Sequence, residues 1–292
     1  MGGDLLNIDE LVRIAVEAGR AILEVKSRGT AVARKEDGSP VTVADRAAHD
    51  VIVRGLLDFE EKRPVVSEEG DIQRMFARAE AVRSYWLVDP LDGTKEYIAG
   101  RPEYTVNIAL IESGVPVAGV VYIPESGRIY RAVRGGGAFC SDASGGPDPM
   151  GPGEGDGFSH SWRRLPLDSL LEARGSSGAI GVMSRSHGSA HTRELFRNLG
   201  IHRILRRGSS LKICAVAEGS ADFYPRLGPT WFWDTAAGVA VAREAGCRVT
   251  DLAGRDLDYH PGGAWKHEGF LVSRQTEWIS AACRILAGGK SR

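Results

Sequence analysis

The chain has 292 residues, 42% of them hydrophobic, which is enough to bury one large core or two packed subdomains. Lysine and arginine number 37 against 38 aspartates and glutamates, which leaves a formal charge of −1. This balance argues against the broad basic surface that nucleic-acid-binding proteins use, so we expect no nucleic-acid partner. No run approaches the roughly 20 apolar residues of a membrane span, and no signal-peptide pattern is present. We therefore expect a cytoplasmic protein.

In the first half of the chain, hydrophobic residues recur at helical spacing and then at strand spacing. Leu11, Ile14 and Ala18 mark a helix expected over residues 7–25, and a similar pattern predicts a second helix over 45–57. Runs rich in Val, Ile and Tyr, separated by glycine-containing turns, predict an antiparallel meander. The strands expected in this half cover residues 64–67, 84–88, 104–111, 115–122 and 127–133.

Residues 141–157 consist almost entirely of Gly, Pro, Asp and Ser. Such a segment cannot bury apolar surface, so we expect a flexible insertion. It would separate an N-terminal α+β subdomain, residues 1–140, from a C-terminal α/β subdomain, residues 158–292. The elements expected in the C-terminal part are helices at 190–199, 210–218 and 234–245, and strands at 179–183, 221–224, 248–250 and 269–273.

The run Asp89-Pro90-Leu91-Asp92-Gly93-Thr94 carries the most chemical information in the sequence. Two carboxylates, with a carbonyl oxygen between them, follow an apolar strand and offer the hard oxygen ligands that Mg²⁺ prefers. Gly93 and Thr94 then open a short helix, whose free N–H groups can face a phosphate. For Asp92 and Gly93 alone, a capped turn is the alternative interpretation.

A different phosphatase chemistry also has to be weighed. The haloacid dehalogenase pattern, Asp-x-Asp-x-Thr after an apolar strand, needs a nucleophilic aspartate two residues before the second acid. Here Pro90 occupies that position, which disfavours an aspartyl-phosphate route.

Other acidic residues lie in contexts that suit a metal site. Glu68 and Glu69 follow a short apolar strand, Asp45 precedes a helix, and Asp234 follows three aromatic residues at the start of another. Their alternatives remain open at this point, because paired glutamates are often solvated and an aspartate at a helix start is often a cap.

Three motifs, in this order, resemble the inositol monophosphatase-like superfamily of Mg²⁺-dependent, Li⁺-sensitive phosphatases. They are Ser67-Glu68-Glu69, Asp89-Pro90-Leu91-Asp92-Gly93-Thr94 and Trp233-Asp234-Thr235-Ala236-Ala237-Gly238. Further motifs are similar to those of the 3′(2′),5′-bisphosphate nucleotidase branch. They are Lys35-Glu36-Asp37-Gly38-Ser39-Pro40-Val41-Thr42, Thr94-Lys95-Glu96-Tyr97-Ile98, Ser184-Arg185-Ser186-His187, Gly208-Ser209-Ser210-Leu211-Lys212 and Tyr224-Pro225-Arg226-Leu227-Gly228-Pro229-Thr230.

The resemblance implies an α+β fold, a layered αβαβα sandwich of the inositol monophosphatase and fructose-1,6-bisphosphatase type. It implies two or three Mg²⁺ ions and a water molecule oriented and deprotonated by Asp45 and Thr94. The metal ligands would be Glu68, Asp89, the Leu91 carbonyl, Asp92 and Asp234, with Glu69 near a weaker site.

The resemblance also implies the substrate contacts. Gly93 and Thr94 would meet the scissile phosphate, His187 would face the adenine, and Ser210 and Lys212 would bind a second phosphate. Glu68, Leu91, Asp92 and Asp234 would also contact the substrate. From the residues alone, His187 could instead be a surface-loop histidine and Lys212 a solvated helix lysine.

Together these features predict a Mg²⁺-dependent, Li⁺-inhibited phosphatase that hydrolyses adenosine 3′,5′-bisphosphate to AMP and phosphate. The resemblance places this reaction in sulfate assimilation. An inositol or sugar monophosphatase is the alternative enzyme, and a non-catalytic phosphometabolite-binding protein is the alternative outside enzymes. The oligomeric state is left open by the sequence.

Overall fold

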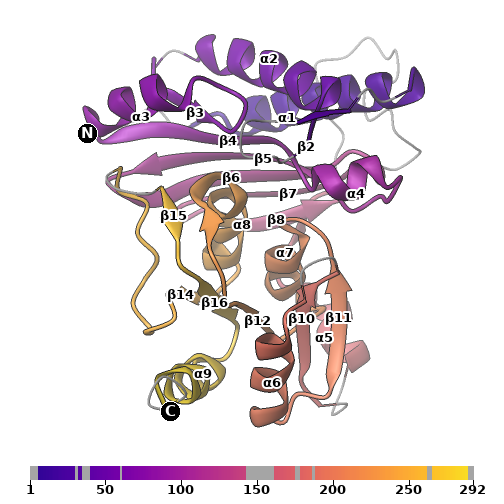
Figure 1. Ribbon diagram of the computed structural model, residues 1–292, viewed down its shortest axis with the longest axis vertical. Helices are drawn as coiled ribbons and strands as arrows, with labels where there is room; N and C mark the ends of the chain where they lie inside the picture. Colours follow the sequence, from indigo (N-terminus) through magenta and orange to yellow (C-terminus); the bar gives the residue numbers. More distant parts are fainter. Residues whose placement is uncertain are drawn as a thin grey trace.

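The computed structural model of the protein describes residues 6–29, 32–34, 40–59, 61–142, 161–174, 178–185, 188–261 and 265–288. Its elements stack in five layers, helices, sheet, helices, sheet and helices, as Figure 1 shows from top to bottom. The layered αβαβα sandwich that the resemblance implied is therefore confirmed.

The first two layers are a pair of helices and a seven-stranded sheet. Helices α1 (Ile8–Ser27) and α2 (Val43–Leu57) cover one face of this sheet, and the predicted apolar stripe of α1 is buried there. The pairing is antiparallel from β4 to β9 and parallel between β3 and β4, which confirms the predicted meander. The strands, in spatial order, are β3 (Val65–Ser67), β4 (Ser84–Asp92), β5 (Thr105–Glu112), β6 (Val115–Ile123), β7 (Arg128–Val133), β8 (Gly137–Ser141) and β9 (Arg163–Arg164).

The middle layer holds α7 (Leu211–Glu218) and α8 (Phe232–Glu244). Both are buried over most of their length, because they lie between two sheets (Figure 1). The second sheet has the order β11-β10-β12-β16-β14, and α6 (Ala190–Asn198) and α9 (Thr276–Gly288) form the last layer. Its strands are β10 (Ile180–Ser184), β11 (Arg203–Arg207), β12 (Phe223–Arg226), β14 (Arg248–Thr250) and β16 (Phe270–Ser273).

Shorter elements complete the chain. They are the strand pairs β1 (Val32–Arg34) with β2 (Pro40–Thr42) and β13 (Thr230–Trp231) with β15 (Lys266–His267), and the helices α3 (Ile72–Glu80), α4 (Thr94–Ile98) and α5 (Asp168–Arg174). Within the described ranges, no helix combines the length and apolar character needed to cross a bilayer.

The seven-stranded sheet continues past the predicted insertion. β9 pairs with β8, so the chain returns to the first sheet before it enters the second. Most of the 141–157 segment lies outside the described residues, and the division at 140 and 158 stays a prediction.

Several elements were not expected from the sequence, among them α3, β11 and α9. β11 reads Arg-Ile-Leu-Arg-Arg and lies at a sheet edge, where charged residues replace the alternation that marks a half-buried strand. In α9 only Ile279 and Ala282 are fully buried, so its apolar stripe is short. Tertiary packing, more than local pattern, determines these elements.

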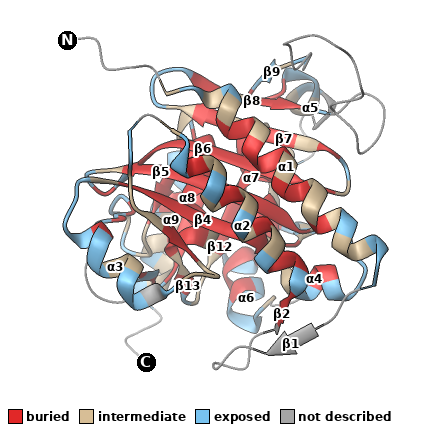
Figure 2. Cartoon of the chain, turned by 90° about the horizontal axis from the view of Figure 1, so that it is seen from above, coloured by how far each residue is buried: buried red, intermediate tan, exposed pale blue. Residues whose placement is uncertain are grey.

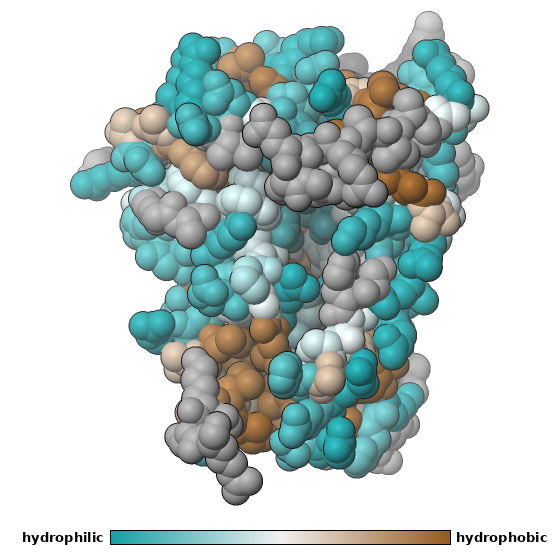
Figure 3. Space-filling view, in the orientation of Figure 1, coloured by the Kyte–Doolittle hydropathy of each residue, from teal (hydrophilic) through white to brown (hydrophobic). Residues whose placement is uncertain are grey.

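Burial is greatest where the layers meet. Figure 2 shows the buried residues concentrated in the strands beneath α1 and α2 and in the helix faces that touch them. On the face seen in Figure 3, hydrophilic side chains predominate, and a hydrophobic area lies at the lower left, near α9.

Candidate active site

Strand register brings the first carboxylates together. In the parallel pair β3 and β4, Ser67 is the partner of Val88, so Glu68 and Asp89 are the next residues on neighbouring strands. The Glu68 N–H donates to the Val88 carbonyl at 3.2 Å, which fixes this alignment. Asp89 is only 1% exposed. Two acidic side chains, 21 positions apart in the chain, therefore start from adjacent points of one sheet.

The strand that carries Asp89 is longer than the sequence predicted. β4 runs to Asp92, and its register with β5 shifts between Asp89 and Asp92. The partners across β5 are Asn107 for Asp89 and Thr105 for Asp92. The irregularity directs the second carboxylate away from the regular pleat of the strand.

Gly93 makes the turn from this strand into α4. Its φ of 96° is in the left-handed region, and a Cβ there would come within 3.1 Å of the Glu103 carbonyl oxygen. Both observations favour glycine at this position. The helix begins at Thr94, as expected from the sequence.

Thr94 connects the turn to α2. Its hydroxyl lies 3.2 Å from Asp45 Oδ1 and 3.3 Å from the Leu91 carbonyl oxygen. Asp45 Oδ2 in turn accepts from the backbone N–H and the hydroxyl of Thr42, both at 2.7 Å. Thr42 is therefore the N-cap of α2, and Asp45, at the third helical position, completes a capping box. Asp45 is therefore not itself the N-cap, so the alternative interpretation of this residue was wrong.

Asp234 occupies the same position in α8. Its Oδ2 accepts from the Thr230 hydroxyl at 2.7 Å and from the Trp231 N–H at 3.1 Å. The preceding aromatics pack tightly, because Trp231 stacks on buried Trp233 with ring centroids 4.6 Å apart. The carboxylate is thus held from two sides, by its cap and by the packing of its helix.

These elements meet around one cavity of about 340 Å³. Nine residues that the sequence singled out line it together. They are Glu68, Asp89, Leu91, Asp92, Gly93, Thr94, Ser210, Lys212 and Asp234. Asp45 reaches the cavity through its bond to Thr94. His187 and residues 35–39 of the first nucleotidase-like motif lie outside the described residues.

The carboxylates in this cavity oppose one another's ionisation. Burial raises the pKa of Asp92 to about 6, and the charge of Glu68 adds to this shift. Burial likewise raises the pKa of Asp234 to about 6, and the charge of Asp92 adds to it. Such crowding is relieved when a cation is shared between the acids.

The donor set fits a hard divalent cation. The atoms available are carboxylate and carbonyl oxygens, which suit Mg²⁺ better than softer metals. Across the described ranges, no three His, Cys, Asp or Glu side chains are yet gathered tightly enough to surround one ion. The residues thus have the right chemistry for such a cation and share one cavity.

Part of the lining of the same cavity is cationic, and we call it the cationic wall. Lys212 is 8% exposed, with its Nζ 5.7 Å from the centroid of the Tyr224 ring, and half-buried Arg226 also lines the cavity. Burial lowers the pKa of Lys212, and the charge of Asp92 opposes that shift. Lys212 is therefore no solvated helix lysine, which removes that alternative.

Ser210 and Ser209 differ in how their hydroxyls are used. The Ser210 hydroxyl donates to Asn107 Oδ1 at 2.9 Å and lies 2.9 Å from Thr105 Oγ1, while its N–H donates to Asp92 Oδ2 at 2.6 Å. Ser209 Oγ is buried and has no hydrogen-bond partner among the described residues. Ser210 thus lines the cavity but binds its neighbours, and Ser209 has the unused hydroxyl.

Sequence reasoning missed Asn107. It is a buried amide in the otherwise apolar strand Thr-Val-Asn-Ile-Ala-Leu-Ile-Glu, and it also contacts Asp92 Oδ2 at 3.4 Å. A polar residue inside an apolar strand was the available signal, because buried amides need partners.

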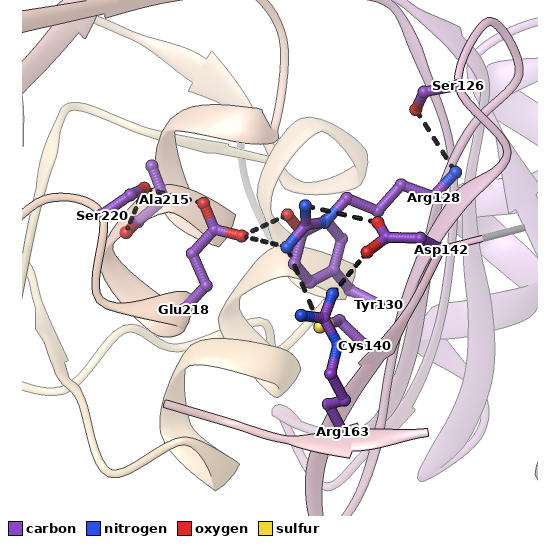
Figure 4. A network of polar contacts seen from close by, with 9 residues as sticks. All are labelled: Ser126, Arg128, Tyr130, Cys140, Asp142, Arg163, Ala215, Glu218 and Ser220. Carbon is purple, nitrogen blue, oxygen red and sulfur yellow. Dashed lines mark hydrogen bonds and ion pairs between the residues drawn. The ribbon is translucent and has the colours of Figure 1, made fainter. Parts of the chain in front are cut away.

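Helix α7, which carries Lys212, is also anchored at its far end. Figure 4 shows Glu218, the last residue of α7, pointing toward Arg128 and Tyr130 of β7. Glu218 Oε2 accepts from Arg128 at 2.9 Å and from the Tyr130 hydroxyl at 2.6 Å. Arg128 is paired in addition with Asp142, at 3.3 Å. The helix is therefore bonded to the first sheet at both ends.

A five-layered fold in which acidic side chains, buried Lys212 and half-buried Arg226 line one cavity is typical of phosphate-ester hydrolases. The chain belongs to the inositol monophosphatase family, which it matches over residues 4–287. The family predicted from the motifs is thereby confirmed. Enzymes of this family generally depend on a metal, typically Mg²⁺.

Individual relatives cover nearly the whole chain. The Escherichia coli K12 protein named 3′(2′),5′-bisphosphate nucleotidase CysQ is 41% identical over 273 residues, which are 91% of this chain and 99% of that protein. The crystal structure of CysQ from Bacteroides thetaiotaomicron superposes with a TM-score of 0.77 at 36% identity, covering 94% and 100% of the two chains. An inositol-1-monophosphatase of Mesorhizobium japonicum is 32% identical over 261 residues, 86% of each chain.

Proposed function

We propose that the protein is a Mg²⁺-dependent 3′(2′),5′-bisphosphate nucleotidase that converts adenosine 3′,5′-bisphosphate and water into AMP and phosphate. The single observation that carries this substrate is the cationic part of the cavity, where buried Lys212 and half-buried Arg226 line the same cavity as the carboxylates. The relatives named 3′(2′),5′-bisphosphate nucleotidase agree with it.

In this proposal, the acidic wall holds the metal. The ligands are Glu68, Asp89, the Leu91 carbonyl oxygen, Asp92 and Asp234, which share the cavity. When bound, Mg²⁺ supplies charge neutralisation of the phosphate and an activated water. Without such a cation, the crowded carboxylates would repel an anionic ester as well as each other.

Thr94 and Asp45 together accept the proton of the attacking water. Asp45 Oδ1 accepts from the Thr94 hydroxyl, which leaves the oxygen of Thr94 free to accept a proton from water. The Thr42 bonds hold Asp45 Oδ2, so the carboxylate keeps its orientation toward Thr94. As the water adds to phosphorus, its proton passes by way of Thr94 to Asp45, the bond from phosphorus to the ribose oxygen breaks, and that oxygen takes up a proton from solvent.

The cationic wall binds the phosphate that is not hydrolysed. Lys212 and Arg226 supply the charge, and Ser209 contributes the hydroxyl that has no internal partner. We assign Ser210, whose N–H donates to Asp92 Oδ2, to positioning that carboxylate. His187 as an adenine contact stays a prediction from the resemblance.

Phosphate release tests the proposal directly. We expect the full-length protein with Mg²⁺ to hydrolyse adenosine 3′,5′-bisphosphate in preference to inositol 1-phosphate, to lose activity with a chelator, and to be inhibited by Li⁺. A preference for the inositol ester would overturn the nucleotidase assignment, and no turnover of either ester would overturn the phosphatase.

An inositol or sugar monophosphatase is the second candidate, because a relative with that name is 32% identical over 261 residues. Such a substrate has only one phosphate, so it would offer no second phosphate for the buried ammonium group of Lys212 to bind. The nucleotidase uses that charge, which is why we prefer it. The place of the reaction in sulfate assimilation and the cytoplasmic location stay predictions.

A further inference from the structure

Two loops of the cationic wall leave the second sheet side by side. In the parallel pair β10 and β11, Ser184 is the register partner of Arg207. Arg185 and Gly208 therefore follow the carboxyl ends of neighbouring strands. Ser184, the last residue of β10, lines the cavity, and so does Ser209, which follows Gly208 and leads to Lys212.

One carboxylate from the first half of the chain is bonded to both loops. Glu103, in the connection between α4 and β5, accepts from Arg185 Nε at 2.7 Å and from a second Arg185 nitrogen at 2.9 Å. Its Oε2 also accepts from the Gly208 N–H at 3.1 Å, and Arg207 Nη1 lies 3.8 Å from Oε1. Bidentate pairs of this kind fix orientation as well as distance.

Close packing reinforces these bonds. A Cβ on Gly208 would lie 2.7 Å from the Glu103 carbonyl oxygen, and one on Gly93 would lie 3.1 Å from the same atom and 3.4 Å from Ser209 Cβ. The phosphate-binding turn at Gly93, the Glu103 connection and the loop at Gly208 are therefore in direct contact. The side chain of Glu103 is only 13% exposed, so water competes weakly for its bonds.

We propose that Glu103 is a positioning residue for substrate specificity, which holds the strand end at Arg185 and the loop at Gly208 at a fixed distance from the turn at Gly93. This rests on the proposed nucleotidase function, because the fixed spacing matters only for a substrate that spans both walls. Glu103 does not line the cavity, so it acts through the residues it holds.

Loss of this contact should separate substrate selectivity from metal chemistry. For Glu103→Ala, we expect kcat/KM for adenosine 3′,5′-bisphosphate to fall about 10- to 100-fold, mainly through KM, because loosening a positioned group has effects of this size. For adenosine 3′-monophosphate, which lacks the second phosphate, kcat/KM should fall no more than roughly threefold. The Mg²⁺ concentration that gives half-maximal activity should also change by no more than this factor. Arg185→Ala should shift the ratio of the two substrates in the same direction.

Two further variants keep the test decisive. Glu103→Gln keeps an acceptor for the Gly208 N–H and should restore part of the selectivity, even if Glu103→Ala folds poorly. Glu244→Ala is the matched control, because Glu244 is another half-buried carboxylate that accepts from backbone N–H groups, those of Gly135 and Gly137, and it does not line the cavity. It should lower the melting temperature without changing the substrate ratio.

The outcomes distinguish the two proposals. If the unmodified protein prefers the bisphosphate but Glu103→Ala and Arg185→Ala leave the ratio within about twofold, the positioning role is overturned alone. An equal loss for both substrates would show a general structural role and would overturn it too. If the unmodified protein shows no preference for the bisphosphate, the proposed function fails and the positioning role fails with it.

Discussion

The two walls of the cavity are built in different ways. The acidic wall is fixed by sheet register, since Glu68 and Asp89 extend paired strands and Asp92 follows a shift in the β4–β5 ladder. The cationic wall is fixed by individual side-chain bonds across the interface, such as Ser210 to Asp92 and Gly208 to Glu103. A change in register alters many bonds together, whereas a side-chain bond is lost by one substitution. Single substitutions should therefore change the arrangement of the acidic wall less readily than that of the cationic wall. Substrate specificity, which depends on the cationic wall, should be easier to change.

Among the substitutions in the acidic wall, we expect Asp92→Asn to cause the largest loss of activity. Losing a carboxylate shared by metal and substrate should reduce kcat by about 10³-fold or more, because the metal supplies several kcal/mol of transition-state stabilisation. The melting temperature without metal should be unchanged or higher, since the repulsion with Asp234 is removed. Asp50→Asn, on the exposed side of α2, is the control. Near-normal turnover by Asp92→Asn would refute the metal assignment.

On the cationic wall, Lys212→Met tests the second anion site while keeping the buried side chain similar in length. We expect kcat/KM for adenosine 3′,5′-bisphosphate to fall roughly 10- to 100-fold, the value of a charge-assisted contact to phosphate. Hydrolysis of adenosine 3′-monophosphate should change much less. Lys62→Met, at an exposed position, serves for comparison. Equal losses on both substrates would mean that Lys212 supports the acidic wall only.

A smaller effect should appear in the pH dependence of stability. Asp92 and Asp234 have a pKa of about 6 in the folded protein, above their ordinary value of 3.8. The metal-free fold thus binds more protons than the unfolded chain in this window, so its free energy of unfolding should fall as pH rises from 4 to 6. Each of the two carboxylates should contribute to this fall, by at most about 1.4 kcal/mol for every unit by which its pKa is raised.

Denaturant unfolding with a chelator, compared between the unmodified protein and Asp92→Asn, isolates this contribution from that of other acids. Saturating Mg²⁺ should remove it, because a bound cation keeps both carboxylates ionised. If the difference between the two proteins does not vary from pH 4 to pH 7, the two carboxylates are not coupled as described.

Much of this architecture could be predicted from the sequence, and the exceptions have a common cause. The stripe of α1 and the β-rich runs of the meander are local patterns, so periodicity was sufficient for them. Asp89 and Asp92 were found because one short motif contains both, and Glu68 and Asp234 because each lies in a short motif of its own. Glu103 and Asn107 could not be found in this way, because their partners lie about a hundred residues further along the chain. Only the folded register shows that they meet.

The anchoring of α7 at both ends has a mechanical consequence. The chain enters this helix from β11 of the second sheet, yet Ser210 at the start of the helix is bonded to β4 of the first sheet. Glu218 at the end of the helix is bonded to β7 of the first sheet (Figure 4). If the two sheets rock against each other, α7 should travel as a rigid body with the first, and any hinge should lie between α7 and β10 or β11. Splitting the chain at residues 141–157 would separate α7 from the strands of the first sheet to which both its ends are bonded. We therefore expect neither fragment to fold alone.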